Sequence, residues 1–201
     1  MPLQWRYEEA ITAFLENQLP PPGLPEITIL GRSNVGKSSL INKLAGRSIA
    51  RSSSTPGKTR SINFFRLRGK HSFYLVDLPG YGYSAVSQDI RRTWKRLIDA
   101  YMARNSAILH LHLVDFRHGY LKGDEALKLW LASLEAPTVT VFTKADKIAR
   151  GRWKTLFSNY FKGQEPAFIT SAETGAGVDD LRHFLEDYVD RSLGGDGHEE
   201  E

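Results

Sequence analysis

The chain has 201 residues, of which 41% are hydrophobic, and a formal net charge of +4; this length suits one well-packed domain and is short for two. The absence of cysteine excludes disulfides, thiolate zinc sites and cysteine nucleophiles. No apolar run approaches the roughly 18 residues that a membrane helix needs, and the N-terminus lacks the apolar core of a signal peptide. We therefore expect a soluble, cytoplasmic protein with no membrane partner.

The two ends differ in composition from the rest of the chain. Residues 1–23 are predicted to form an N-terminal helix, in "WRYEEAITAFLENQ", that leads into a proline-rich linker, "PPPGLP". Residues 24–192 are predicted to form the folded domain. Residues 193–201, which contain "GGDGHEEE", are predicted to be a disordered acidic tail.

Strand-like and helix-like segments alternate through the domain. The strand "EITIL" precedes a glycine-containing turn and the helix "KSSLINKLAG". A polar loop, "RSIARSSSTPGKTR", is followed by "SINFFRLR" and "HSFYLVDL", which read as a hairpin, and then by a helix and three further strand–helix pairs. The pattern predicts a three-layer α/β fold: a mostly parallel sheet of about six strands with one antiparallel edge hairpin, and helices on both faces. Such sheets bind ligands at the carboxyl ends of their strands.

The loop after the first strand, "GRSNVGKS", fits the phosphate-binding pattern G-x-x-x-x-G-K-[ST] between a strand and a helix. Its glycines allow backbone N–H groups to surround phosphates, and the start of the helix adds its positive dipole end. Lys37 is predicted to reach the β- and γ-phosphates, and Ser38 to ligate Mg²⁺; an ordinary glycine turn is the alternative. The predicted nucleotide-binding residues here are Gly31, Arg32, Ser33, Asn34, Val35, Gly36, Lys37, Ser38 and Ser39.

Three further segments follow strands in the order that a nucleotide site requires. In "DLPG", Asp77 is placed to bind Mg²⁺ through water and the Gly80 N–H to sense a γ-phosphate, with Leu78 and Pro79 between them. In "TKAD", a carboxylate can accept hydrogen bonds from guanine N1–H and its amine, which favours GTP over ATP. The predicted base-binding residues are Thr143, Lys144, Ala145 and Asp146, together with Thr170, Ser171 and Ala172 of "TSAETG". An ATP-using enzyme remains the alternative.

Together these motifs resemble the EngB family of translation-factor-class P-loop GTPases. The resemblance rests on "LPEITILGRSNVGKSSLIN", "SSTPGKTRSINFF", "LVDLPGYGYS", "DFRHG" and "TKADK", and covers residues 24–189. It implies an EngB-type GTPase domain that binds GTP or GDP with Mg²⁺, and Thr143 fits that family's pattern. It also implies that Thr59 is a switch threonine and Mg²⁺ ligand, flanked by nucleotide-binding Gly57, Lys58, Arg60 and Ser61. The residues alone leave Thr55 as a competitor for the switch role.

The same resemblance implies a role in assembly of the large ribosomal subunit, and a requirement for normal cell division and septation. One feature of the sequence independently fits a ribosomal RNA partner. Residues 27–76, which we call the basic stretch, contain no Asp or Glu before Asp77 but ten Lys and Arg residues. A solvated surface is the alternative, and nothing in the pattern demands more than a monomer.

Tyr81 directly follows "DLPG", where many GTPases place a glutamine that orients the attacking water. Three explanations remain open: little unaided hydrolysis, a group supplied by an activator, or K⁺ bound beside Asn34. The predicted catalytic residues are Asn34, Lys37 and Gly80. A slow GTPase switch stimulated by K⁺ or a partner is the favoured function, and a nucleotide-regulated binding module with negligible hydrolysis is the alternative.

Overall fold

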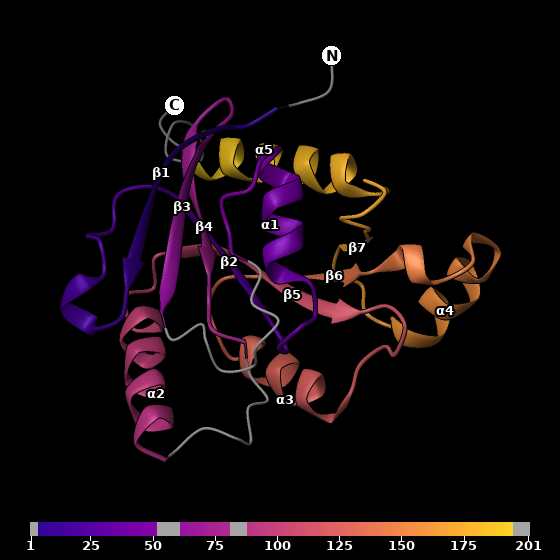
Figure 1. Ribbon diagram of the computed structural model, residues 1–201, viewed down its shortest axis with the longest axis horizontal. Coiled ribbons are helices and arrows are strands. Elements are labelled where there is room, and N and C mark those ends of the chain that lie inside the picture. Colours follow the sequence, from indigo (N-terminus) through magenta and orange to yellow (C-terminus); the bar gives the residue numbers. More distant parts are fainter. Residues whose placement is uncertain (1–3, 52–60, 81–87, 195–201) are drawn as a thin grey trace, which may run out of the picture.

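The computed structural model describes residues 4–51, 61–80 and 88–194 (Figure 1). Its strands are β1 Arg6–Ala13, β2 Glu26–Gly31, β3 Ile62–Arg68, β4 Ser72–Asp77, β5 Ala107–Asp115, β6 Thr138–Thr143 and β7 Ala167–Ile169. Its α-helices are α1 Lys37–Ala45, α2 Gln88–Met102, α3 Lys122–Leu131, α4 Trp153–Tyr160 and α5 Val178–Gly194. Short 3-10 helices cover Glu16–Gln18, Ala145–Lys147 and Arg150–Arg152.

The strands form one sheet in the order β1-β3-β4-β2-β5-β6-β7. Strands β4, β2, β5, β6 and β7 pair in parallel, whereas β3 pairs antiparallel with both β4 and β1. The predicted hairpin, Ile62–Arg68 with Ser72–Asp77, is confirmed. The parallel order brings the carboxyl ends of β2, β4, β5 and β6 to one edge of the sheet, where the predicted loops meet.

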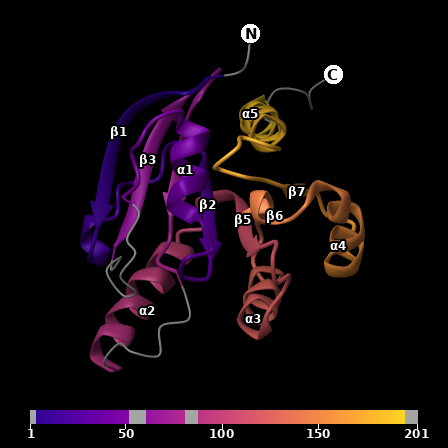
Figure 2. The same cartoon turned by 45° about the vertical axis from the view of Figure 1, so that its right-hand side comes forward.

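Helices cover both faces of the sheet, which confirms the three-layer α/β architecture (Figures 1 and 2). On one face, α1 and α5 pack together, and Leu40 and Leu185 join Ile29 of the sheet in a single apolar cluster. On the other face, Leu97 of α2 and Leu131 of α3 enter a second cluster. Helix α4 packs against Phe142 of β6 in a third cluster. The sheet is therefore buried on both sides, as its long apolar runs require.

The prediction of an N-terminal helix is wrong, because this segment forms the edge strand β1. It pairs antiparallel with β3, and its addition gives seven strands instead of about six. Trp5, just before the strand, is buried; its indole N–H donates to Glu186 Oε2 at 2.5 Å and its ring meets Phe73 edge-on. The helix-favouring composition of the segment is a weak local preference. Pairing with the otherwise open edge of β3 outweighs it.

The predicted domain limits at residues 24 and 192 stay predictions, although both ends continue into structure attached to the domain. Strand β1 belongs to the main sheet, and α5 extends to Gly194, two residues into the predicted tail. The remainder of that tail, residues 195–201, lies outside the described residues.

Candidate nucleotide-binding site

The turn between β2 and α1 carries the predicted phosphate loop, residues 31–38. Gly31 ends β2 beside β5, where a Cβ would lie 2.8 Å from the carbonyl oxygen of Leu113. Asn34 and Gly36 have φ angles of 59° and 110°, in the left-handed region that glycine and asparagine tolerate best. Helix α1 then begins at Lys37. The strand–turn–helix context that the sequence pattern requires is therefore present.

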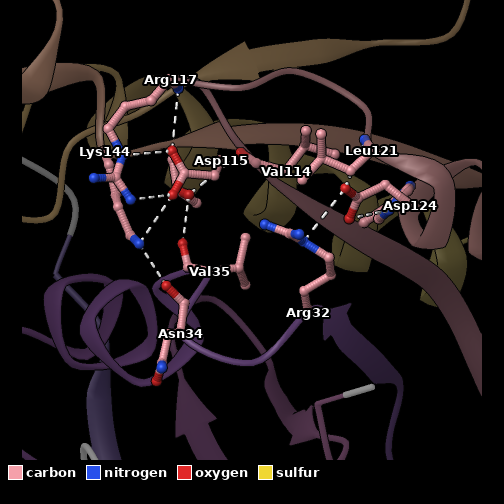
Figure 3. Close-up of polar contacts among 11 residues, drawn as sticks. Arg32, Asn34, Val35, Val114, Asp115, Arg117, Leu121, Asp124 and Lys144 are labelled. Atoms are coloured by element: carbon pink, nitrogen blue, oxygen red, sulfur yellow. Dashed lines mark hydrogen bonds and ion pairs between the residues drawn. The ribbon is translucent and has the colours of Figure 1, made fainter. Parts of the chain in front are cut away.

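The side chain of Arg32 leaves this loop toward α3. Its Nε lies 3.5 Å from Oδ2 of Asp124, a buried carboxylate that also accepts a hydrogen bond from the Leu121 N–H at 2.9 Å. Figure 3 shows Arg32 directed at Asp124. The ion pair joins the first part of the loop to the start of α3.

A cavity of about 590 Å³ opens beside the loop. Three segments line it: the phosphate loop with α1, the loop after β6, and the loop after β7. Of the residues predicted from the sequence, the lining contains Gly36, Ser39, Thr143, Lys144, Asp146, Thr170 and Ala172. The structure thus brings the phosphate-loop segment and the two base-side segments to one cavity.

Half of the lining was not among the residues predicted from the sequence to bind the nucleotide. The additional residues are Leu40, Asn42, Lys43, Gly46, Arg47, Lys147 and Glu173. A helical projection from Ser39 would have found part of this set, because Asn42 and Lys43 follow it at the i+3 and i+4 spacing of one helix face. Arg47 follows the end of α1, and no spacing argument places it here.

Thr143 and Lys144 join the loop after β6 to the phosphate loop. The Thr143 hydroxyl donates to the carbonyl oxygen of Val35 at 2.6 Å, and it lies 3.3 Å from that of Val114. Lys144, in the left-handed conformation with φ 59°, donates from Nζ to the carbonyl oxygen of Asn34. The Thr143 side chain therefore binds the protein backbone here.

Asp146 stands at the cavity with both carboxylate oxygens held. Ser171 Oγ donates to Oδ1 at 2.8 Å, and Lys147 Nζ lies 3.0 Å from Oδ2. The Ser171 oxygen in turn accepts the Thr174 N–H at 3.1 Å. Partial burial opposes ionisation, but the hydrogen bonds from Ser171 and Lys147 outweigh it and lower the pKa of Asp146. The carboxyl is thus an ionised, oriented acceptor at neutral pH.

The residues predicted for the phosphate side, Lys37, Asp77 and Gly80, lie near one another but are not among the lining residues of the cavity. Asp77 is buried at the end of β4, and its Oδ1 has no hydrogen-bond partner among the described residues. Burial raises the pKa of Asp77 to about 6, although the charge of Lys37 acts in the opposite direction. A Cβ on Gly80 would lie 3.0 Å from Lys37 Nζ and 3.1 Å from the Ser33 nitrogen. "DLPG" therefore lies directly against the phosphate loop.

Several predicted site residues use their side chains for packing or hydrogen bonding within the protein. Val35, Leu78 and Ala145 are buried in apolar clusters. The Thr170 hydroxyl bonds the Phe142 carbonyl oxygen at 3.0 Å. The Ser61 hydroxyl, also buried, lies 3.4 Å from Asn63 Oδ1.

Comparison with known proteins shows the family of this chain. The sequence model of a family described as 50S ribosome-binding GTPase matches residues 26–144. "Probable GTP-binding protein EngB" of Syntrophomonas wolfei is 43% identical over 84% of this chain and 89% of its own length. The protein of the same name from Heliobacterium modesticaldum is 42% identical over 89% of this chain and 90% of its own. The chain belongs to the EngB family of GTP-binding proteins.

Solved structures support the fold of this EngB-family chain. A tyrosine-to-alanine variant of Era from Aquifex aeolicus, bound to GDP·AlF₄⁻, superposes with a TM-score of 0.68 at 25% identity, over 81% of this chain and 56% of that one. A crystal structure of a probable GTP-binding protein EngB gives a TM-score of 0.63 at 24% identity, over 83% of this chain and 99% of that one. Both likenesses establish the P-loop GTPase fold.

Part of the predicted site lies outside the described residues. These predictions are the switch candidates Thr55 and Thr59, their neighbours Gly57, Lys58 and Arg60, and Tyr81. In the described part of the chain, no three His, Asp or Glu side chains gather as a metal site would require. There too, no helix is long and apolar enough to cross a membrane.

Acidic residues from distant parts of the chain neutralise one end of the basic stretch. Arg66 Nε lies 2.9 Å from Glu8, and its NH1 3.1 Å from Glu9, both on β1. Lys70 pairs with Asp190 of α5. These ion pairs therefore reduce the excess positive charge of the basic stretch around Arg66 and Lys70. At the other end of the stretch, Lys43 and Arg47 line the cavity.

Proposed function

We propose that this EngB-family chain binds GTP and GDP with Mg²⁺ and acts as a slow GTPase switch in assembly of the large ribosomal subunit. The observation that carries the proposal is the single cavity in which Lys144 and Asp146 stand beside the start of α1. A nucleotide placed there would meet base-reading groups at one end and the phosphate loop at the other.

Guanine selection would rest on Asp146. As an ionised acceptor held by Ser171, its carboxylate suits guanine N1–H and the exocyclic amine, neither of which adenine offers. The methylene stem of Lys144 would lie along the purine plane, and the Ala172 N–H would meet guanine O6. Competition between GTP and ATP for the same site tests this assignment against the ATP-using alternative, which predicts displacement by ATP at similar concentration.

The phosphate side fits Mg²⁺. A buried carboxylate oxygen without a described partner, on a group whose pKa burial raises to about 6, is suited to a cation as its missing partner. Ser38 and Asp77 would hold the ion, with Thr59 as a third ligand, in the one- or two-carboxylate mode typical of nucleotide-bound magnesium. When bound, the ion would neutralise charge on the β- and γ-phosphates. Lys37 would contact the same phosphates, and the Gly80 N–H would report the presence of the γ-phosphate.

Hydrolysis would be slow without help. A tyrosine at position 81 cannot orient water as glutamine does, and a phenol is a poor base at neutral pH. Asn34 is the chain's own candidate to recruit K⁺, because its side chain is exposed while Lys144 holds its carbonyl oxygen. K⁺ would stabilise charge that develops in the transition state. A partner that inserts an arginine would be worth about 10³–10⁵-fold.

The ribosomal partner is supported by the family description, 50S ribosome-binding GTPase. We propose that the chain acts as a monomer in the cytoplasm. We also propose that its contribution to cell division and septation follows from ribosome assembly.

The deciding experiment is GTP turnover in K⁺ and in Na⁺ buffer, with and without purified large ribosomal subunits, and with small subunits as the matched control. Stimulation by K⁺ and by large but not small subunits would support a ribosome-triggered switch. Turnover near background in every condition, with GTP still bound, would contradict it. In that case the alternative, a nucleotide-regulated binding module, would describe the chain.

A further inference from the structure

Asp115, the last residue of β5, belongs to the "DFRHG" segment and has no part in the function proposed above. Its carboxylate is buried and lies between two cations (Figure 3). Lys144 Nζ is 3.0 Å from Oδ2. Arg117 donates from Nε to Oδ1 at 2.9 Å and from NH2 to Oδ2 at 2.7 Å, a two-point contact. Asp115 therefore touches the cavity only through Lys144.

Lys144 makes a second contact, which links this ion pair to the phosphate loop. The same ammonium group donates to the Asn34 carbonyl oxygen of the phosphate loop. One lysine thus joins the end of β5 to the phosphate loop, and its Cε lies 3.9 Å from where a Cβ on Gly36 would be. A lysine side chain loses rotamer entropy when it is fixed. A neutral carbonyl alone is a weaker partner for an ammonium ion than a carboxylate is.

Arg117 keeps the carboxylate of Asp115 ionised and fixed in orientation. Its guanidinium is 40% exposed at the rim, and its backbone N–H also donates to Asp115 Oδ1, at 3.1 Å. Burial disfavours the carboxylate, but the hydrogen bonds from Arg117 and Lys144 outweigh it and hold the pKa of Asp115 well below its usual range. The carboxylate is therefore charged and fixed in orientation throughout the neutral range.

We propose that Asp115 is a positioning residue for guanine-nucleotide retention: it holds Lys144 over the base and against the phosphate loop, and so slows nucleotide release. The inference rests on the proposed nucleotide site and deepens it. Without Asp115, Lys144 would spend part of its time in other rotamers, and the nucleotide would lose the surface that packs on the purine and the link between base loop and phosphate loop.

The test is the dissociation rate of a fluorescent GDP, chased with excess GDP, in a double-mutant cycle of Asp115→Asn and Lys144→Ala. Loss of one charge-assisted hydrogen bond predicts release about 10- to 100-fold faster in Asp115→Asn. In the Lys144→Ala background, Asp115→Asn should add less than about twofold, because the residue through which Asp115 acts is gone. Arg117→Ala, a change at an exposed side chain, should accelerate release to a smaller extent.

Glu26→Gln is the matched control. Glu26 is also a buried carboxylate with an arginine partner, Arg104 at 3.0 Å, but it lies at the opposite end of the sheet. Both variants should lose stability toward urea, and only Asp115→Asn should release GDP faster. Equal release rates in the two variants, or equal effects of Asp115→Asn with and without Lys144, would overturn the inference while the nucleotide site stands. Failure of the unmodified chain to bind GDP would overturn both.

Discussion

The base side of the candidate site, at the cavity, and the phosphate side, around Asp77, differ in how completely the protein itself satisfies their polar groups. On the base side, Asp146 is bonded by Ser171 and Lys147, and Lys144 by Asp115 and the phosphate loop. On the phosphate side, the buried Oδ1 of Asp77 has no hydrogen-bond partner among the described residues.

This difference suggests that the two sides have separate roles in nucleotide binding. Groups already held in place cost little reorganisation when a ligand arrives, so the base side should set affinity and selectivity. A buried carboxylate without a described partner is destabilising until a cation joins it, so the phosphate side should respond to Mg²⁺ and to the γ-phosphate. Four experiments follow, from the largest expected effect to the smallest: two act on one side alone, and two act on the structure that both sides share.

Asp146→Asn should weaken guanine recognition on the base side of the site. An amide in place of the carboxylate faces guanine donors with one donor of its own, so GDP affinity should fall by about 10²–10³-fold. Affinity for xanthosine diphosphate, whose O2 can accept from the amide, should rise. Fluorescence titration with both nucleotides measures the change. Asp180→Asn, at an exposed acid on α5, is the matched control, and an equal loss there would point to a nonspecific charge effect.

Acidification should weaken the sheet beneath both sides. His110 and His112 lie buried on β5, and burial lowers the pKa of each to about 4. Between pH 6.5 and 4 the unfolded chain therefore binds protons that the folded chain does not. Stability therefore falls as the pH drops through this window, by roughly 2 kcal/mol per histidine from pH 7 to 5. Asp77 acts in the opposite sense, because burial raises its pKa to about 6.

A single variant isolates the histidine contribution. His112→Phe keeps a ring beside Tyr120 but cannot bind a proton. Urea unfolding at pH 7 and 5 should show a loss about 2 kcal/mol smaller in this variant than in the unmodified chain. An identical pH dependence of the two proteins would mean that His112 binds protons equally well in the folded and unfolded states.

Gly31→Ala should damage the frame that both sides share. A Cβ there would lie 2.8 Å from the Leu113 oxygen and 2.9 Å from Val35 Cγ1, so backbone must move, at a cost of about 1–3 kcal/mol. Gly151→Ala has open space around its Cβ and should change stability by less than about 0.5 kcal/mol. Chemical denaturation compares the two, and equal midpoints would contradict the close packing described here.

Gly80→Ala should separate the phosphate side from the base side. The new methyl group would lie against Lys37 Nζ and the Ser33 nitrogen. Binding of the γ-phosphate should weaken by about tenfold, which corresponds to about 1.4 kcal/mol. GDP affinity should fall by a smaller factor, because GDP lacks the γ-phosphate to which the Gly80 N–H is assigned and keeps its base contacts. Gly23→Ala, where nothing lies within 4 Å, is the control. Equal losses of GTP and GDP affinity would refute the assignment of Gly80.

Features that depend on short segments of the chain and on strand order could be predicted from the sequence. The strand–turn–helix around Lys37, the hairpin of β3 and β4, and the convergence of Thr143, Asp146 and Ala172 all follow from local spacing and strand order. The carboxyl ends of parallel strands meet at one edge of the sheet. The strand order alone therefore predicts that the loops of the site lie together.

Features that depend on contacts between distant segments escaped prediction. Residues 6–13 read as a helix because local composition says nothing about the open edge of β3. The basic stretch looked uncompensated because Glu8, Glu9 and Asp190 reach it from the two ends of the chain. The Asp115–Lys144 ion pair likewise joins two strand ends whose side-chain directions no spacing rule gives.

The most direct test of the central claim is an equilibrium titration of the unmodified chain with GDP and with ADP in the same Mg²⁺ buffer. A preformed acceptor at Asp146 predicts that GDP binds at least about 100-fold more tightly than ADP, because a site built for guanine donors rejects a base that lacks them. Equal affinity for the two nucleotides would contradict the account.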